Sequence, residues 1–215
     1  WFTHDLEAFL STYNERNFTL YERLITQPRI LLDYAGNLLL IPGTSPMSLF
    51  HDDFVKSTDL FNPLTTLVSL IMCAVVLIFA YFNMGNKAGA LLAGFVFYLA
   101  AHLVESTFIP LEMYFEHRNY LPAFGIYFSI VTTIACLLPK LKFKNIFVTL
   151  LLITPLTFSV FTYQRAIIWQ KMTRILLYSE ITHPESIRVN EGLAFLYILI
   201  NDSDNALHHL DKVIE

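Results

Sequence analysis

The sequence predicts an all-α membrane protein, and three observations support this fold class. Hydrophobic residues make up 55% of the 215-residue chain and charged residues only 15%, a balance typical of polytopic membrane proteins. Apolar runs long enough to cross a bilayer recur in the middle of the chain. After the last run, apolar residues recur at helical spacing instead. We expect an amphipathic or interfacial segment over residues 1–62, a four-span membrane domain over 63–164 and a further helical region over 165–215.

The first segment contains an apolar stretch, residues 20–41, that is interrupted by charged side chains, among them Glu22, Arg23 and Asp33. Because its uninterrupted part is too short to cross a bilayer, we interpret it as an amphipathic or re-entrant helix at the outer boundary of the membrane. Pro42 and Gly43 are expected to end it. If this stretch spans the membrane instead, the amino terminus moves to the cytoplasmic side.

The membrane domain is predicted to cross the bilayer four times, since a spanning helix needs roughly 20 predominantly apolar residues. The four runs are residues 63–82, 88–104, 120–138 and 146–163. Four lysines lie in or beside the two short connections that follow the first and third runs, which places these connections in the cytoplasm by the positive-inside tendency. The opposite face then receives residues 1–62, the loop 105–119 and everything after about residue 164.

The region after the last span is predicted to end in a helical hairpin, with helices over 185–201 and 204–215. Its packing positions resemble those of one tetratricopeptide repeat. These positions are Leu193, Ala194, Tyr197, Ala206, Leu210 and Val213. The first aromatic position of the repeat holds Asn190 instead. Since one repeat cannot bury its own apolar face, we expect further repeats beyond Glu215 and interpret the chain as a piece of a longer protein.

Charged and polar residues gather on the predicted outer face, just before the third span and at the end of the second. Charges at a membrane boundary need a partner or water, so such a group favours a binding site for a charged lipid headgroup. His102 and Glu105 are three positions apart and would share one helix face. The predicted binding residues are Arg118, His117, Glu116, Glu105, His102 and Tyr120.

Arg118 is the strongest candidate of this group, because a guanidinium can bind phosphate through two hydrogen bonds and this one lies at the expected depth of a lipid phosphate. The alternative is a structural ion pair with Glu105 or Glu116. For His102 the alternative is a hydrogen-bonded structural histidine. Tyr120 fits an interfacial anchor as well as a substrate contact.

A divalent cation is a weaker alternative on the same face. His51, Asp52 and Asp53 precede the first span, and with Glu105 they offer hard ligands, although no metal-ligand spacing supports the site. Soluble-enzyme chemistry is disfavoured, because the sequence has no Gly-x-Ser-x-Gly elbow and no phosphate-binding glycine loop. A net charge of −4 with scattered Lys and Arg residues excludes a nucleic-acid-binding face.

One motif in the polar group resembles a known family. Glu116, Tyr120, Pro122 and Gly125 form Glu-x-x-x-Tyr-x-Pro-x-x-Gly at the start of a span, which resembles the transmembrane and tetratricopeptide-repeat glycosyltransferases, membrane enzymes of the GT-C class. The resemblance implies transfer of a sugar, with inversion, from a polyprenyl-phosphate carrier to a protein or glycan acceptor. It further implies a bacterial inner-membrane protein with the repeats on the periplasmic face. The eukaryotic pattern has an arginine directly after the glutamate, where this chain has His117.

The resemblance also implies roles for single residues. Arg118 with His117 would bind the carrier phosphate, Glu105 and Glu116 would orient the carrier or the acceptor, and the repeats would present the acceptor. The catalytic carboxylate of GT-C enzymes lies in a first outer loop, which we expect outside this sequence, so no catalytic residue is assigned. Two other functions remain open: a membrane-anchored repeat scaffold for envelope or pilus assembly, and an envelope-polysaccharide polymerase or ligase.

Overall fold

The computed structural model describes residues 12–39, 49–83, 85, 87–140 and 144–214, and all regular structure among them is helical, which confirms the all-α prediction for this part of the chain. The residues form two compact units, each described by itself. Unit 1 consists of Trp1–Leu38, Val55–Met113 and His117–Lys140, and unit 2 of Leu39–Phe54, Tyr114–Glu116 and Leu141–Glu215. Both units combine segments from distant parts of the sequence.

Unit 1 begins with a short 3-10 helix, η1 (Thr12–Glu15), and the long helix α2 (Leu20–Leu39). A capping box starts α2, because the Thr19 N–H donates to the Glu22 carboxylate (2.7 Å) and the Glu22 N–H donates to the Thr19 hydroxyl (3.2 Å). Where the sequence predicted an amphipathic or re-entrant helix, the structure has one continuous helix. Its buried face is partly polar: Arg23, Ile25, Thr26, Gln27, Ile30, Tyr34 and Ala35.

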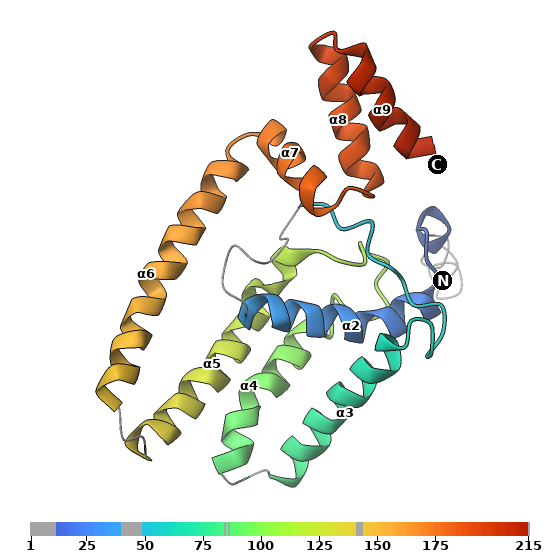
Figure 1. Cartoon of the computed structure of the whole chain (residues 1–215). Coiled ribbons are helices and arrows are strands. Elements are labelled where there is room, and N and C mark those ends of the chain that lie inside the picture. Colours follow the sequence, from blue (N-terminus) through green and yellow to red (C-terminus); the bar gives the residue numbers. More distant parts are fainter. Residues whose placement is uncertain (1–11, 40–48, 84, 86, 141–143, 215) are drawn as a thin grey trace, which may run out of the picture. The chain divides into compact units, whose positions relative to one another are not determined.

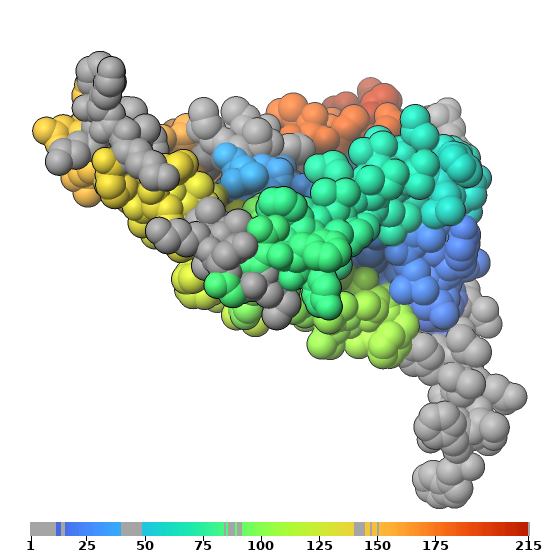
Figure 2. Space-filling view, turned by 90° about the horizontal axis from the view of Figure 1, so that it is seen from below, coloured from blue at the N-terminus to red at the C-terminus, as the bar shows by residue number. Residues whose placement is uncertain are grey.

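Three further helices of unit 1 run side by side, and α2 crosses their ends (Figure 1). They are α3 (Thr65–Phe82), α4 (Lys87–His102) and α5 (Tyr120–Leu137). Hydrogen bonds fix this crossing: Tyr98 of α4 donates to the Leu31 carbonyl (2.5 Å), and Asn119, just before α5, donates to the Tyr34 carbonyl (3.3 Å). Figure 2 shows the start of α2, in blue, against the teal segment that precedes α3.

Helices α4 and α5 pack closely because glycines face each other. A Cβ added at Gly94 would lie 2.1 Å from the Gly125 carbonyl oxygen, and one added at Gly125 would lie 2.3 Å from the Gly94 carbonyl oxygen. Small residues at such contacts let two backbones approach, which is a common way to join helices in membranes. This contact brings the end of α4 and the start of α5 together, and both carry predicted site residues.

Within the described part of the chain, three segments are long and apolar enough to cross a membrane: Thr65–Phe82, Glu116–Leu137 and Leu151–Trp169. They correspond to the first, third and fourth predicted spans, and the membrane-protein class is thereby supported. The second predicted span, residues 88–104, is helical over α4, but its apolar part is the shorter stretch Leu92–His102. The fourth span belongs to a 26-residue helix, α6 (Lys144–Trp169), that continues six residues past the expected end at Tyr163.

Unit 2 contains α6, α7 (Met172–Thr182), α8 (Ile187–Leu199) and α9 (Ser203–Ile214). The last two correspond to the predicted pair of helices, with ends that differ by one or two residues from the expected ones. Asn201 in the turn between them has a positive φ of 59°, a conformation that asparagine tolerates better than most residues. Leu176, Val189 and Leu193 form the core of this region, with Phe50 packed against it.

The departure from the repeat pattern at Asn190 has a structural explanation. Asn190 is 2% exposed, its amide donates to the carbonyls of Pro184 and Ser186 (both 2.9 Å), and its side-chain oxygen lies 2.8 Å from Nδ1 of His209. The His209 ring also stacks on Tyr197. A polar bridge therefore joins α8 to α9 where an aromatic side chain was expected.

We predict that Gly125→Ala destabilises the chain by about 1–3 kcal/mol, because the added methyl group would overlap the α4 backbone. Gly36→Ala in α2 is the matched control, since an added Cβ there meets nothing within 4 Å. It should be neutral or stabilising by about 0.5–1 kcal/mol, the usual effect of removing a glycine from a helix. Thermal unfolding of the detergent-solubilised protein measures both, and an equal effect of the two changes would contradict the close contact.

Candidate functional site

Two of the predicted site residues meet in unit 1, at the loop of residues 103–113 that follows α4. Arg118 lies in a short 3-10 helix, η2 (Glu116–Asn119), directly before α5. Its Nε is 3.4 Å from the Glu105 carboxylate, and its Nη1 donates to the Glu112 carbonyl (2.7 Å). The Arg118 side chain is 7% exposed and that of Glu105 is 48% exposed. The alternative given above, an ion pair between Arg118 and Glu105, is thus present in the structure.

The residue that organises this loop is Arg23 of α2, which was not among the predicted site residues. Its guanidinium is completely buried. Its Nε donates to the Thr107 carbonyl (2.9 Å), its Nη1 to the Leu111 carbonyl (2.5 Å) and its Nη2 to the Glu105 carbonyl (2.7 Å). One side chain therefore holds three points of loop 103–113, and one of them is the backbone of the residue that pairs with Arg118.

Two neighbours of Arg23 hold the rest of the loop. Gln27, one turn further along α2, donates to the Met113 carbonyl (3.1 Å), and the Tyr13 hydroxyl of η1 donates to the Phe108 carbonyl. Side chains of α2 and η1 thus provide hydrogen-bond donors to the carbonyls of residues 105, 107, 108, 111 and 113. These carbonyls have partners although the loop forms no helix or sheet. Loop 103–113 is consequently a fixed structural element.

Arg16, Arg23 and Arg118 lie close enough in this region to influence one another electrostatically. Burial, together with the nearby charges of Arg118 and Arg16, lowers the pKa of Arg23 to about 10. In the part of the chain that the structure describes, the hydrogen-bond acceptors of Arg23 are neutral carbonyls rather than carboxylates. Glu105 is already paired with Arg118, and Glu22 with Lys56 at 3.3 Å. Arg23 therefore depends on carbonyl dipoles, whereas Arg118 has a carboxylate partner.

His102 does not reach this surface. It is 1% exposed, and its ring lies between those of Tyr34 (centroids 5.6 Å apart, stacked) and Tyr98 (4.9 Å, edge-on). Its Nε2 atom has no hydrogen-bond partner among the described residues. The two remaining candidates of η2 and α5 are at the surface: His117 is exposed, and Tyr120 is 91% exposed.

Glu116 and the weak metal candidates lie together in unit 2, in a second polar cluster. His51 Nε2 is 2.9 Å from the Glu116 carboxylate, and the His51 ring packs on Tyr114 and, edge-on, on His183. Asp53 accepts from His183 (2.9 Å), while Asp52 accepts from the Ser186 hydroxyl (2.5 Å).

Asp52 also accepts from the Arg188 N–H (3.2 Å), so it caps the start of α8 together with Ser186. Residues 51–53 thus each bind different partners, which are Glu116 for His51, Ser186 and Arg188 for Asp52, and His183 for Asp53. Among the described residues, no group of three or more His, Cys, Asp or Glu side chains is arranged to hold a metal ion. The cluster attaches the segment before α3 to the corner between α7 and α8.

Comparisons with protein-family models, curated proteins and solved structures find no match to this chain. The resemblance of the Glu116 motif to GT-C enzymes therefore stays a prediction from the sequence. The structure shows the surroundings of Arg118 and of loop 103–113, but it does not test that resemblance.

The importance of Arg23 had a weak signal in the sequence. A single arginine in an amphipathic helix is normally interpreted as a residue that faces water or headgroups. Arg23 repeats with Thr26, Gln27, Ile30 and Tyr34 at helical spacing, and these four residues are buried as well. The spacing shows that these residues share one face of α2, but it does not show that this face is buried. The polar residue Arg23 is buried because the carbonyls of loop 103–113 accept its hydrogen bonds.

We predict that Arg23→Met destabilises the protein by about 3 kcal/mol or more, since it removes a buried charged donor from three partly buried carbonyls. Arg29→Met is the matched control in the same helix. Arg29 is partly exposed and donates to the Val55 carbonyl (2.8 Å), so its loss should cost less. Thermal unfolding in detergent and protease cleavage within loop 103–113 should both rank the variants in this order. The reverse order would contradict the anchoring role.

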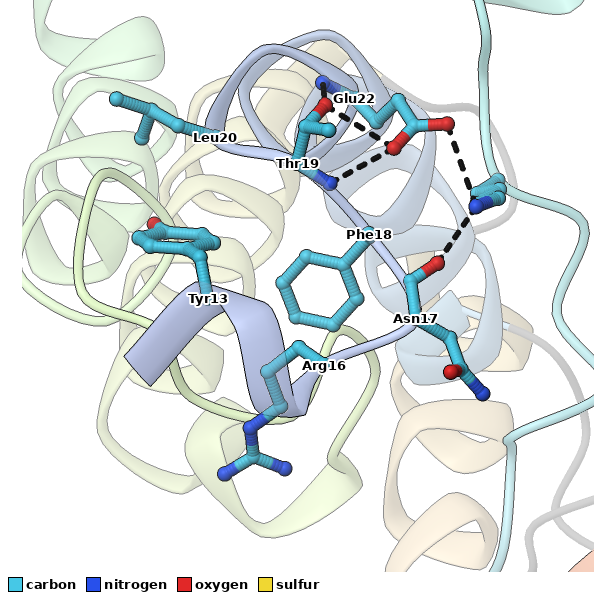
Figure 3. Close-up of a pocket in the computed structure, with 8 residues that line it drawn as sticks. Tyr13, Arg16, Asn17, Phe18, Thr19, Leu20 and Glu22 are labelled. Carbon is cyan, nitrogen blue, oxygen red and sulfur yellow. Dashed lines mark hydrogen bonds and ion pairs between the residues drawn. The ribbon is translucent and has the colours of Figure 1, made fainter. Parts of the chain in front are cut away.

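A pH dependence is predicted at the start of α2. The hydrogen bond from the Thr19 backbone (Figure 3) lowers the pKa of Glu22, with a smaller contribution from Lys56. A carboxyl whose pKa is lower in the folded state stabilises that state above its unfolded pKa of about 4.3, and this contribution is lost as pH falls through the folded pKa. Acidification from pH 5 to pH 3 should therefore lower the melting temperature more in the wild type than in Glu22→Gln. Parallel curves would contradict this assignment.

Proposed function

We propose that this chain is part of a membrane glycosyltransferase and that unit 1 binds the phosphate of a polyprenyl-phosphate-linked sugar. The observation that carries this proposal is the group of three arginines, Arg16, Arg23 and Arg118, around loop 103–113. The innermost of them, Arg23, is buried, and its hydrogen-bond acceptors among the described residues are neutral carbonyls. A buried charge of this kind is costly unless something of opposite sign lies close by. A bound phosphate would supply that charge.

Arg118 would make the direct contact. Its present partner, the Glu105 carboxylate, is about half exposed and 3.4 Å away. An exposed ion pair of this kind contributes little free energy, so a phosphate could displace Glu105 from Arg118 and leave the carboxylate in water. A phosphate oxygen offers Arg118 a shorter, charge-assisted hydrogen bond. His117, exposed beside it in η2, can add a second donor when protonated. Glu105 would then be released to orient the acceptor or the carrier.

In the proposed reaction, an acceptor oxygen or nitrogen attacks the anomeric carbon of the sugar with inversion. The bond from that carbon to the phosphate oxygen breaks, and the lipid phosphate departs with the electron pair. Arg118 stabilises the charge that develops on this leaving group. The proton of the acceptor passes to a carboxylate that we expect outside this sequence.

The proposed topology places this site on the periplasmic face of a bacterial inner membrane. Helices α3 to α6 would form four spans, with α4 as a short one. The lysines at residues 140 and 142 then lie in a cytoplasmic connection, and the apolar length of the three other spans is sufficient. The helices α8 and α9 would be the first tetratricopeptide repeat and would present a protein or glycan acceptor.

One observation favours a second function, that of a membrane-anchored repeat scaffold. Helices α8 and α9 expose large apolar side chains, including Phe195 (64%), Ile198 (53%) and Leu207 (58%), as repeats do when they stack on a neighbour or bind a partner. A scaffold does not require the arginine group of unit 1, so the two functions predict different results for the same mutation.

The test is Arg118→Ala in the intact gene, followed by mass spectrometry of envelope proteins and glycans. We expect transfer to fall roughly 10²–10³-fold, the usual effect of removing one donor to a developing charge, while membrane insertion is retained. Arg174→Ala is the matched control, because Arg174 is an exposed arginine of α7. Full transfer in Arg118→Ala would refute the enzyme proposal. A gene deletion without any glycan change would favour the scaffold.

A further inference from the structure

Helix α7 follows the apolar helix α6 almost without a break. Two residues, Gln170 and Lys171, separate Trp169, the last residue of α6, from Met172, the first residue of α7. Since the chain advances at most about 3.6 Å per residue, Met172 lies within about 11 Å of Trp169. Figure 1 shows that α7 does not continue the direction of α6 but turns across its end. With α6 as a span, α7 begins in or beside the headgroup layer, which is about 5–8 Å thick on each side of the bilayer.

The two faces of α7 are both apolar, but they contact different surroundings. The inner face contains Ile175 and Leu176, which are buried, and Leu176 belongs to the apolar core shared with α8. Leu177 and Ile181 lie one turn apart on the other side of the helix, and they are 42% and 81% exposed. An apolar outer face directly beside a span fits the boundary between headgroups and acyl chains, where interfacial helices bury such side chains.

The junction between α6 and α7 carries an excess of positive charge. Residues 164–182 contain three basic residues, Arg165, Lys171 and Arg174, and one acidic residue, Glu180. The Glu180 carboxylate lies 3.7 Å from a histidine of α9. Basic residues beside a span are attracted to anionic lipids, because these lipids give the membrane surface a negative potential. The charge of the junction therefore complements the phosphates of anionic phospholipids.

Two of the three cations are placed for contact with lipid. Lys171 is exposed at the turn. Arg165 lies one turn before the end of α6, and its guanidinium is 4.9 Å from the ring centroid of Tyr178 in α7. An arginine near the end of a span extends its charged group toward the headgroups. Arg174 is instead committed to the protein, because its Nη1 donates to the Ile167 carbonyl in the last turn of α6 (3.0 Å).

We propose that α7 lies on the membrane surface, with Leu177 and Ile181 inserted among the lipids and with Lys171 and Arg165 bound to the phosphates of anionic phospholipids. Trp169 is 51% exposed at the end of α6, and tryptophan is enriched at this boundary of the membrane. Insertion of apolar side chains and attraction of charges both strengthen the binding of an interfacial helix. The inference requires α6 to span the membrane but not glycosyl transfer, so it goes beyond the proposed function.

This contact has a consequence for the end of the chain. Helix α7 shares its apolar core with α8 through Leu176, Val189 and Leu193, and α8 is bridged to α9 by Asn190 and His209. A helix held on the lipid surface therefore fixes the position of the α8–α9 pair relative to the bilayer.

Fluorescence quenching of Trp169 tests the contact with anionic lipid. In the 215-residue chain, Trp1→Phe leaves Trp169 as the only tryptophan. The protein is placed in nanodiscs that mix phosphatidylglycerol with phosphatidylcholine, with bromine on the acyl chains of one lipid or of the other. We expect phosphatidylglycerol to bind beside Trp169 several-fold more tightly than phosphatidylcholine, and this preference should fall as salt screens the charges. Equal quenching by the two brominated lipids overturns the proposal.

Charge variants identify the residues that bind the lipid. Lys171→Gln should reduce the preference for phosphatidylglycerol about fivefold, the effect of one basic residue near an anionic surface. Arg165→Gln should act in the same direction. Lys212→Gln in α9 is the matched control and should keep the preference of the wild type. A preference that is unchanged in both Lys171→Gln and Arg165→Gln overturns the proposal.

A spin label at Ile181→Cys tests the insertion of α7. Cys73 and Cys136 are replaced by serine, so that the label attaches at one position. Labels at Leu156→Cys in the span and at Asp204→Cys, an exposed position of α9, are the references for lipid and water. We expect oxygen to relax the label at position 181 more than a water-soluble nickel chelate does, as at position 156. Relaxation like that at position 204 places α7 in water, and protection from both agents shows that protein covers this face; either result overturns the proposal.

Discussion

The structure of unit 1 depends on one buried arginine. Arg23 lies on the inner face of α2 and holds three carbonyls of loop 103–113, over a sequence distance of more than eighty residues. Lysine could not do this, because its single ammonium lacks the flat fork that donates in three directions. Charge-assisted hydrogen bonds to groups that would otherwise be unsatisfied offset part of the cost of burying the charge.

A second constraint is the close approach of α4 and α5. Gly94 and Gly125 leave room for each other's backbone, so the end of α4 and the start of α5 lie together under α2. Residues 103–119 connect these two ends, and within this connection Arg118 of η2 pairs with Glu105 of loop 103–113. The glycine contact brings the two helix ends together, and Arg23 then fixes the loop between them. Loss of either would move the groups that the proposed site needs.

The segments of unit 2 are held together by polar side-chain contacts more than by a large apolar core. Its apolar centre is small, with Leu176, Val189 and Leu193 buried and Phe50 packed on them. Around it, Asp52 and Asp53 bind the corner before α8, and His51 binds Glu116. The segment that the sequence offered as a weak metal site is thus a connection between parts of this unit. Carboxylates and imidazoles in adjacent positions serve helix capping and pairing as readily as metal binding.

The sequence by itself determined the helical class, the apolar helices and the pair of amphipathic helices at the end. These follow from local properties: hydrophobic period, run length and capping residues such as Thr19 and Glu22. It also identified Arg118 and Glu105 as a pair that could meet. Only the tertiary structure decided that they do meet, that His102 is enclosed by two tyrosines, and that Glu116 belongs with His51. It alone revealed the role of Arg23. The reason is physical. The partners of Arg23 are backbone carbonyls, which every residue carries, so the side chains of loop 103–113 give no sign in the sequence that this loop binds Arg23.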